Sequence, residues 1–385
     1  MKKGKKQVII IKADPLERSP HLFKVFNTLT EAGFEVTVLC WNREKDVANT
    51  SKNSENSSIK RNMLEFNIKT PFGFSSIPFL ILWWCYVFLK LVKFSRWQIA
   101  HVINFPSLFP TLLICKITRK PLIYEILDSP YADQIVMPKI LRNIFLEIER
   151  FFTQFPDVII IVDELQIQEF RGIPNKKVVV IYDSPPDVSK MLSKLSITGK
   201  DSEVFELFYA GVLYKQRKLN LEKIIEAIRG LNGIKLLIAG YGDMVEEIIK
   251  WCSSYPDKVQ YIGRLNYEQV LEESMKAHLL FVLRDPIVPV NRYICGSKFL
   301  EATMCGKPIL VNKKTSTAIK VIRSKCGFAV DANDVGEVRD TILKLKNDQK
   351  LCKMLGVNGR KAYEQKYGWS VMKQRLLDLY SKLLA

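Results

Sequence analysis

Histidine is scarce in this sequence, with three among 385 residues, and the eight cysteines contain no pair at CxxC spacing. Without a nearby histidine, no zinc pattern can be assembled from those cysteines. We therefore expect no metal, and we interpret the cysteines as reduced, buried thiols of a cytosolic protein. Long apolar runs are also missing. The most apolar stretch, FLILWWCYVFL at 79–89, has eleven residues, short of the ~20 that a membrane-spanning helix needs.

We do not expect the N-terminal segment to be a secretory signal. The N-terminus, MKKGKKQVIIIKADP, is basic and then apolar, but its apolar run is too short for a signal peptide and Lys12-Ala13-Asp14 ends it. We interpret it as a first β-strand, and we expect the protein to be cytoplasmic.

Acidic residues are few between 51 and 120: this stretch contains ten lysines and arginines, and its only acidic residues are Glu55 and Glu65. The whole chain has a net charge of +18, which favours polyanionic partners. Residues 77–120 combine these cations with tryptophans, which suits the headgroup zone of an anionic membrane. The helix expected at 77–94 can be an interfacial helix, a core helix or a span. We expect no nucleic acid as partner, because no nucleic-acid-binding motif is present.

The pattern of apolar segments predicts an α/β fold. In the first half, strands are expected at 7–12, 35–40, 98–103, 121–126, 157–161 and 177–181, with helices between most of them. The second half repeats the alternation, with strands at 205–210, 234–239, 258–262, 279–283, 308–312 and 327–330. The helices expected between them lie at 219–231, 243–253, 267–276, 297–305 and 316–324. Such alternation predicts two doubly wound parallel sheets, with ligands bound at the carboxyl ends of the strands. We expect domains at 1–187 and 205–365, a linker at 188–204 and a final helix at 366–385.

Three segments of the second half place glycine beside polar or cationic residues where a predicted strand ends. They are 208–218 (FYAGVLYKQRK), 238–243 (IAGYGD) and 291–308 (NRYICGSKFLEATMCGKP). Cations and free amides at a helix start favour phosphate groups, and Glu301, one turn into the third segment, can accept both hydroxyls of a ribose. Each segment also has a simpler interpretation as an ordinary turn, a solvated loop or a surface helix.

The order and spacing of these segments over 205–385 resemble the donor-binding domain of glycosyltransferase family 4, of the retaining GT-B class. Further matching pieces are VQYIG (259–263), KFLEA (298–302), CGKP (305–308) and YGW (367–369). The first half resembles the family more loosely, through GFEVTVL (33–39) and PLIYEILD (121–128).

The resemblance implies a retaining hexosyltransferase with two Rossmann-like domains facing a cleft, and a final helix that crosses back to the first domain. Its substrate would be a UDP- or GDP-sugar, with no further cofactor. The implied donor-binding residues are Gly211, Arg217, Lys218, Gly240, Gly242, Gly263, Arg264, Gly296, Ser297, Lys298 and Glu301. The predicted catalytic residues are Glu301, Lys298 and Asp128, where Asp128 contacts the acceptor or serves in proton transfer.

The acceptor is expected on the first domain, at Asp14, Arg18, His21 and Asp128. Arg18 can bind an acceptor phosphate or form a surface salt bridge, and Asp128 can equally cap the segment that follows it. Together with the basic, aromatic region 77–120, these residues predict a glycan or polyprenyl-phosphate-linked acceptor at the inner face of the cell membrane, in polysaccharide biosynthesis. We expect a monomer or a homodimer.

Three positions depart from the family pattern. Tyr293 stands where the family has the first of two glutamates, Val212 replaces the first loop cation, and Leu127 replaces a histidine before Asp128. These departures favour a rival hypothesis, an inactive nucleotide-sugar-binding scaffold protein. A basic nucleic-acid-binding protein is the third alternative.

Overall fold

The chain divides into two compact α/β units. The computed structural model describes residues 6–15, 19–43, 59, 62–70, 73–128, 130, 138–170, 172–173, 178–188 and 204–384. The first unit comprises Met1–Asp183 together with Lys373–Ala385, and the second is Ser184–Met372. Most of the predicted linker, 189–203, lies outside the described residues, as does Arg18.

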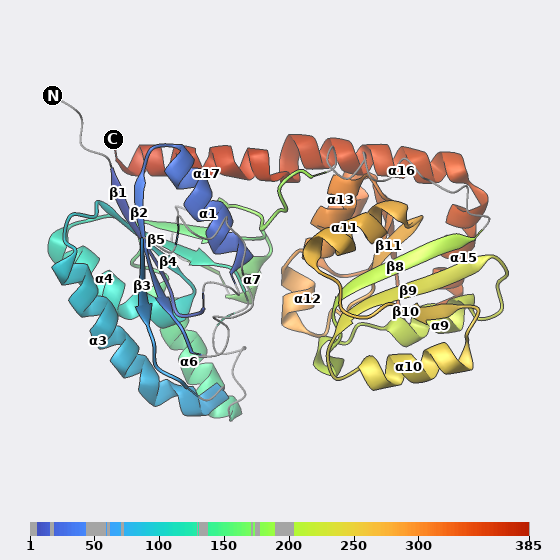
Figure 1. Cartoon of the computed structure of the whole chain (residues 1–385), viewed down its shortest axis with the longest axis horizontal. Coiled ribbons are helices and arrows are strands. Elements are labelled where there is room, and N and C mark those ends of the chain that lie inside the picture. The colour runs from blue at the N-terminus through green and yellow to red at the C-terminus, as the bar shows by residue number, and fades with distance from the viewer. Residues whose placement is uncertain are drawn as a thin grey trace. The chain divides into compact units, whose positions relative to one another are not determined.

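The first unit is built on a parallel sheet of seven strands (Figure 1). Its strands are β1 (Gln7–Lys12), β2 (Glu35–Trp41), β3 (Met63–Phe66), β4 (Ile99–Ile103), β5 (Leu122–Ile126), β6 (Val158–Ile161) and β7 (Val178–Val180). Their order is β3-β2-β1-β4-β5-β6-β7, so the winding reverses between β1 and β4. Ligands of such sheets bind outside the carboxyl ends at this switch point.

The second unit repeats the same order with six parallel strands. They are β8 (Phe205–Val212), β9 (Ile234–Tyr241), β10 (Val259–Tyr261), β11 (Leu279–Val282), β12 (Ile309–Asn312) and β13 (Gly327–Val330). The order β10-β9-β8-β11-β12-β13 puts the switch point between β8 and β11. The predicted fold class, two doubly wound parallel α/β sheets, is confirmed.

Helices cover both sheets. Those of the first unit are α1 (Pro20–Glu31), α3 (Ile77–Lys93), α4 (Leu108–Thr118), α6 (Lys139–Phe152) and α7 (Gln166–Glu169), with short 3₁₀ turns η4 (Gly73–Ser76) and η5 (Phe105–Ser107). Those of the second are η6 (Lys215–Arg217), α9 (Leu221–Ile228), α10 (Val245–Ser254), α11 (Tyr267–Lys276), α12 (Pro289–Tyr293), α13 (Ser297–Cys305), α14 (Ser316–Ser324), α15 (Val335–Asn347), α16 (Gln349–Ala362) and the π-helical η7 (Tyr363–Tyr367). The chain ends in α17 (Trp369–Leu383), whose residues from Lys373 onward belong to the first unit.

The two faces of the first sheet differ in chemistry. One face forms an apolar core with α3 and α4, in which Ile9, Ile11 and Val102 join Trp83 and Leu112. The opposite face holds buried polar groups on neighbouring strands, where Glu125 and His101 meet side chains of α1 and α17. Parallel strands buried on both faces account for the near-continuous apolar runs of the sequence.

The apolar helix α3 is core on one side and exposed on the other. Leu80, Trp83, Val87 and Leu91 are buried, at the spacing of one helix face. The opposite face, which includes Leu82 and Leu89, is exposed. None of the helices in the described part of the chain combines the length and the apolar character that crossing a membrane requires. Of the three interpretations of 77–94, the structure supports the core role for one face and leaves the other open for an interface.

Candidate donor site

The strongest predicted segments meet at the switch point of the second sheet. Gly211 is the penultimate residue of β8, and Lys298 lies in the first turn of α13. A methyl group added at Gly211 would lie 3.7 Å from the Cε atom of Lys298, so the lysine side chain passes directly beside this glycine. The two segments therefore lie together at the carboxyl edge of the sheet, where a doubly wound fold binds its ligand.

Lys298 forms an ion pair inside its own helix. Its Nζ donates to Oε2 of Glu301 at 2.6 Å, and the side chains are 19% and 6% exposed. Glu301 also borders a small cavity with Phe208 and Tyr209, and the buried Tyr209 hydroxyl has no hydrogen-bond partner among the described residues. The carboxylate and the cation predicted to hold a ribose and a diphosphate thus lie in contact, and the Tyr209 hydroxyl lines the same small cavity.

The glycines of 238–243 serve the packing of the neighbouring loop. A Cβ at Gly240 would lie 1.9 Å from the carbonyl oxygen of Gly211, and one at Gly242 would lie 2.3 Å from that of Leu213. Both have positive φ, 145° and 150°, a region that side chains rarely adopt. Backbone packing is therefore sufficient to explain these two residues, and their contact with a donor stays a prediction.

The loop after β8 is tied to the loop after β11. Asn291, which is buried, donates its Nδ2 to the carbonyl oxygen of Arg217 at 3.0 Å, and the amide of Asp285 donates to the carbonyl oxygen of Lys218 at 2.9 Å. These bonds place the backbone of both predicted cations at the switch point. Asn291 was not predicted, because an asparagine that anchors a loop leaves no periodic signal in the sequence.

Asp243 precedes α10 but does not hold its N-cap position. Met244 holds the N-cap position of α10. The Oδ1 atom of Asp243 instead accepts from the amide of Lys215 at 2.8 Å. Asp243 therefore orders the cationic loop, which is a long-range role that local sequence cannot show.

The first turn of α13 offers amide groups without a side-chain cap. Gly296 is the N-cap and has no side chain to accept from them, and its own amide lies 3.4 Å from Oγ1 of Thr317 at the start of α14. Within α14, Lys320 is buried and donates to Ser316 Oγ at 2.7 Å. Two helix starts and a buried cation together make this corner favourable to anions. The strand–helix alternation predicts a helix at 316–324, and α14 confirms it.

Gly263 and Arg264 lie at the end of the neighbouring strand pair. The amide of Gly240 donates to the carbonyl oxygen of Gly263 at 2.9 Å. The guanidinium of Arg264 lies 4.4 Å from the ring centre of Tyr241, which is 44% exposed. An exposed ring stacked on a cation is a surface on which a nucleobase can lie, and Tyr241 was not predicted to serve in the site.

The predicted acceptor residues of the first unit occupy different environments. Asp14 is half-exposed after β1, with the buried Nζ of Lys12 at 3.9 Å. Asp128 is exposed after β5, and Asn104 Nδ2 lies 3.4 Å from its Oδ2. In the strand order, β4 lies between β1 and β5, so both carboxylates stand at the carboxyl edge of one sheet.

His21 is buried within a network of charges. Its Nδ1 and Nε2 lie 2.9 Å and 2.8 Å from Asp183 and Glu125. Burial opposes protonation, but the two carboxylates outweigh it and raise the pKa of His21 to about 9. Since both ring nitrogens are occupied, acceptor contact by His21 stays a prediction that requires one of these bonds to open.

Family models identify the chain. Residues 193–362 match the family described as Glycosyl transferases group 1, and residues 20–183 match the one described as Glycosyltransferase Family 4. The chain belongs to glycosyltransferase family 4. The predicted family and the predicted enzyme class, a glycosyltransferase, are confirmed.

Relatives and solved structures extend this result. A capsular polysaccharide biosynthesis glycosyltransferase, CapM of Staphylococcus aureus, is 23% identical and aligns over 74% of this chain and 86% of its own. A GDP-mannose-dependent phosphatidylinositol monomannoside mannosyltransferase of Corynebacterium glutamicum is also 23% identical, over 38% of each chain. Among solved structures, sucrose-phosphate synthase of Thermosynechococcus elongatus aligns over 99% of both chains with 15% identity and a TM-score of 0.75. WaaG, a glycosyltransferase involved in lipopolysaccharide biosynthesis, aligns over 96% of this chain and 98% of its own, with 14% identity and a TM-score of 0.64. These structures share the GT-B fold of this glycosyltransferase.

Proposed function

We propose that this glycosyltransferase transfers a hexosyl group from a nucleoside-diphosphate sugar to a lipid-linked glycan acceptor, with retention of anomeric configuration. The observation that carries the proposal is the Lys298–Glu301 pair beside Gly211 at the switch point of the second sheet. In this proposal Glu301 accepts hydrogen bonds from the ribose hydroxyls. Lys298 faces the diphosphate, together with the backbone amides of Ser297 and its neighbours.

The chemistry needs charge stabilisation more than a protein base. As the bond between the anomeric carbon and the phosphate oxygen breaks, negative charge builds on the leaving diphosphate. Fixed cations and helix-end amides stabilise that charge. The acceptor oxygen attacks the face that the diphosphate leaves, and the departing phosphate oxygen takes its proton. Among the described residues no group of three or more His, Cys, Asp or Glu side chains is arranged to hold a metal ion, and the proposed steps use none.

The donor is either a UDP- or a GDP-sugar. A solved structure of similar fold, HepE of Anabaena, is described in complex with UDP and glucose (13% identity, TM-score 0.68), whereas the Corynebacterium relative is named for GDP-mannose. The acceptor binds the first unit at the edge that carries Asp14 and Asp128, where Arg18 and His21 are also proposed to act.

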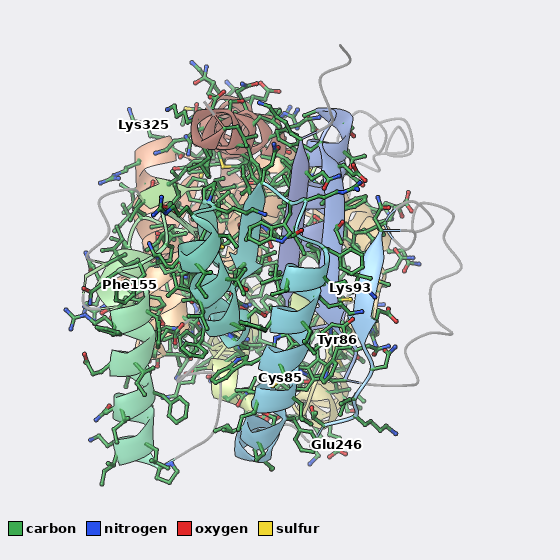
Figure 2. The ribbon with its side chains drawn as sticks, turned by 90° about the vertical axis from the view of Figure 1, so that its left-hand side faces the viewer. Cys85, Tyr86, Lys93, Phe155, Glu246 and Lys325 are labelled. Atoms are coloured by element: carbon green, nitrogen blue, oxygen red, sulfur yellow. The ribbon has the colours of Figure 1, made fainter. Side chains whose placement is uncertain are left out.

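Three neighbouring helices of the first unit form a surface suited to a bilayer, seen side by side in Figure 2. We name it the three-helix apolar face. Its exposed residues are Ile81, Leu82, Phe88, Leu89 and Val92 on α3, Phe109, Leu113 and Ile117 on α4, and Ile140, Ile144, Ile148 and Phe151 on α6. The rings of Trp84 and Phe109 lie 5.2 Å apart, and those of Phe109 and Phe152 lie 5.6 Å apart, so the helices are in contact.

The charges around this face match an anionic membrane. Residues 73–120 contain no aspartate or glutamate, while Lys90, Lys93 and Arg96 follow the apolar residues of α3. Monomeric soluble proteins rarely expose an apolar patch this continuous. We therefore propose a peripheral location at the inner face of the cell membrane and a role in polysaccharide or glycolipid synthesis.

Glu301→Gln tests the donor site, with Glu273→Gln as matched control. Glu273 also pairs with a lysine three residues away, Lys276, on the adjacent helix α11. Donor affinity is measured by calorimetry over a panel of UDP- and GDP-sugars. We expect the wild type to bind at least one donor, and Glu301→Gln to bind it about tenfold or more weakly, because a hydrogen bond to a charged group contributes ~1.5–3 kcal/mol.

The control should bind as the wild type does. The proposal is wrong if no donor binds, or if the two variants lose affinity equally. Transfer to a polyprenyl-phosphate-linked acceptor is assayed on the same proteins. Donor binding without hydrolysis or transfer would favour an inactive nucleotide-sugar-binding protein.

A further inference from the structure

A pocket of about 370 Å³ opens at the amino edge of the second sheet, opposite the donor site. Three adjacent strands contribute to it: Phe205 begins β8, His278 precedes β11, and Lys307-Pro308 precede β12. The end of α15 and the first turns of α16 complete the wall. The lining residues are Phe205, His278, Gly306, Lys307, Pro308, Leu345, Lys346, Gln349, Cys352 and Lys353.

The polar lining is cationic. It contains three lysines and no carboxylate. Within the part of the chain that the structure describes, no carboxylate forms an ion pair with any of them, and Lys346 donates to the carbonyl oxygen of Asn232. Burial lowers the pKa of Lys307. An unpaired ammonium group in a partly enclosed pocket is stabilised when an anion binds beside it.

Two acidic residues, Asp348 and Glu206, lie near the pocket in the chain but do not line it. Asp348, the N-cap of α16, accepts from the amide of Leu351, and Glu206 lies next to Phe205 in the chain. The amide of Glu206 donates to Nδ1 of His278 at 3.1 Å. In the neutral ring this leaves the proton on Nε2. His278 thus offers a further donor to an anion.

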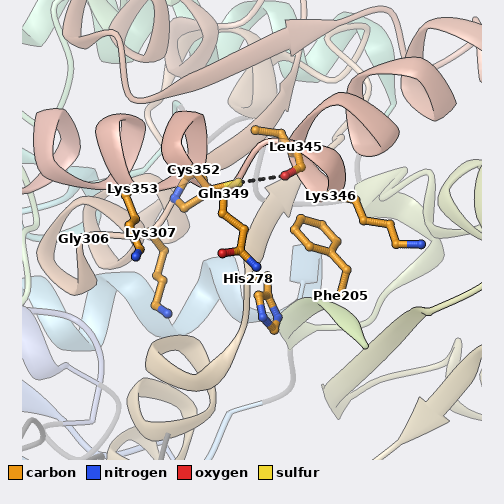
Figure 3. A pocket seen from close by; sticks show the side chains of 10 residues that line it. Phe205, His278, Gly306, Lys307, Leu345, Lys346, Gln349, Cys352 and Lys353 are labelled. Carbon is orange, nitrogen blue, oxygen red and sulfur yellow. Dashed lines mark hydrogen bonds between the residues drawn. The ribbon is translucent and has the colours of Figure 1, made fainter. Parts of the chain in front are cut away.

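The other side of the pocket is apolar. The rings of Phe205 and His278 lie 5.2 Å apart, tilted by 33°, and Pro308 and Leu345 lie close by. Figure 3 shows these groups around one space, with Lys307 and Lys353 at one end and Phe205 and Lys346 at the other. Small-molecule sites commonly have volumes of about 300–1,000 Å³ and combine apolar walls with a few polar groups.

We propose that this pocket is a second ligand site, separate from the donor site, for a small molecule that carries a phosphate monoester and a flat apolar group. Lys307, Lys353 and His278 bind the phosphate, and Phe205, Pro308 and Leu345 pack against the apolar part. Helix α13 spans between the two sites: Ser297, Lys298 and Glu301 lie near its start, and Gly306-Lys307 follow its last residue. A ligand in the pocket therefore touches the chain directly after the helix that carries the donor site.

The three histidines make a direct test possible. In protein labelled with ¹³C at histidine Cε1, only His278 lies in the pocket, while His21 and His101 sit in the buried network of the first unit. Phenyl phosphate is the probe, and inorganic phosphate and phenol are tested separately to represent its anionic group and its apolar group. We expect phenyl phosphate to move the His278 signal saturably, phosphate to do so at higher concentration, phenol to have no effect, and the two other signals to stay in place.

Substitution of the lysines decides the matter. The double variant Lys307→Gln, Lys353→Gln should bind phenyl phosphate about tenfold or more weakly. Lys350→Gln, on the same turn of α16 but outside the lining, should bind as the wild type does. An unmoved His278 signal, an equal response to phenol, or equal losses in both variants would overturn the proposal. Because these experiments use no nucleotide-sugar, a negative result would count against the second ligand site and not against the proposed donor site.

Discussion

Glu125 is the single residue that links most of the buried charges in the first unit. It is 1% exposed, and its two oxygens lie 2.8 Å from Nε2 of His21 and 3.0 Å from Nε2 of His101. Burial alone would raise the pKa of Glu125, but the two histidines hold it well below the usual range. His101 in turn contacts the hydroxyl of Tyr380 on α17 at 2.8 Å. The network therefore ties the final helix to the sheet.

The raised pKa of His21 predicts a pH-dependent stability. The pKa of His21 is about 9 in the folded chain and 6.5 for a free histidine. Protonated His21 therefore adds to the free energy of unfolding below pH ~6.5, and this stabilisation is lost as the pH rises through about 9. The advantage of wild type over His21→Gln should thus fall by on the order of 3 kcal/mol between these limits. Urea unfolding followed by tryptophan fluorescence measures it, since four of the six tryptophans lie in the first unit.

His278→Gln is the control for this measurement. Burial, and then Lys307, lower the pKa of His278, so this ring stays neutral over the same pH range. The free energy of unfolding of His278→Gln should therefore differ from that of the wild type by a nearly constant amount. A pH-independent difference for His21→Gln would show that His21 is not held protonated by its two carboxylates.

At the scale of elements, α13 shows what local sequence can specify. Its predicted range, 297–305, is confirmed, because Gly296 opens it and Gly306, with φ of 64°, ends it. The short edge strand β3 was missed, since its four half-exposed residues follow a polar loop and show no alternation. Helix α12 was also missed, because its five residues are too few to show a helical period. Helices α15 and α16 were missed because their many charged residues hide the buried stripe.

The three-helix apolar face yields a prediction about these elements. Leu89, Ile117 and Ile140, one on each helix, are 66%, 67% and 76% exposed, so replacing them with glutamate should not unfold the unit. Each apolar side chain that enters a bilayer contributes roughly 1.5–3 kcal/mol. The triple Glu variant should therefore bind phosphatidylglycerol-containing vesicles at least about tenfold more weakly than wild type.

Flotation with vesicles measures this binding. Ile322→Glu, whose side chain on α14 is 62% exposed in the second unit, is the control and should float as the wild type does. Vesicles of phosphatidylcholine alone should bind less protein, because the flanking lysines and arginines find no anionic headgroups. If wild type and triple variant float equally, or neither floats, the face does not bind membranes.

For the whole molecule, the sequence was sufficient for the fold class and the family but not for the roles of individual charges. Strand–helix alternation and the glycine-rich segments predicted two doubly wound sheets, because these features depend on local pattern. The pairing of Lys298 with Glu301 was not predicted, nor was the burial of His21, because both depend on which side chains the folded chain brings together. For Gly240 and Gly242 the sequence allowed both a ligand contact and an ordinary turn, and the close backbone of Gly211 and Leu213 supports the turn while donor contact stays a prediction.

The account rests on a nucleotide held by the second unit with its ribose at Glu301, and a crystal structure with UDP or GDP bound tests it most directly. We expect the ribose hydroxyls within hydrogen-bond distance of the Glu301 carboxylate, and the diphosphate beside Gly211 and the amides of Ser297 and Lys298. A nucleotide bound away from the β8–β11 switch point, with Glu301 still paired to Lys298 alone, would contradict it.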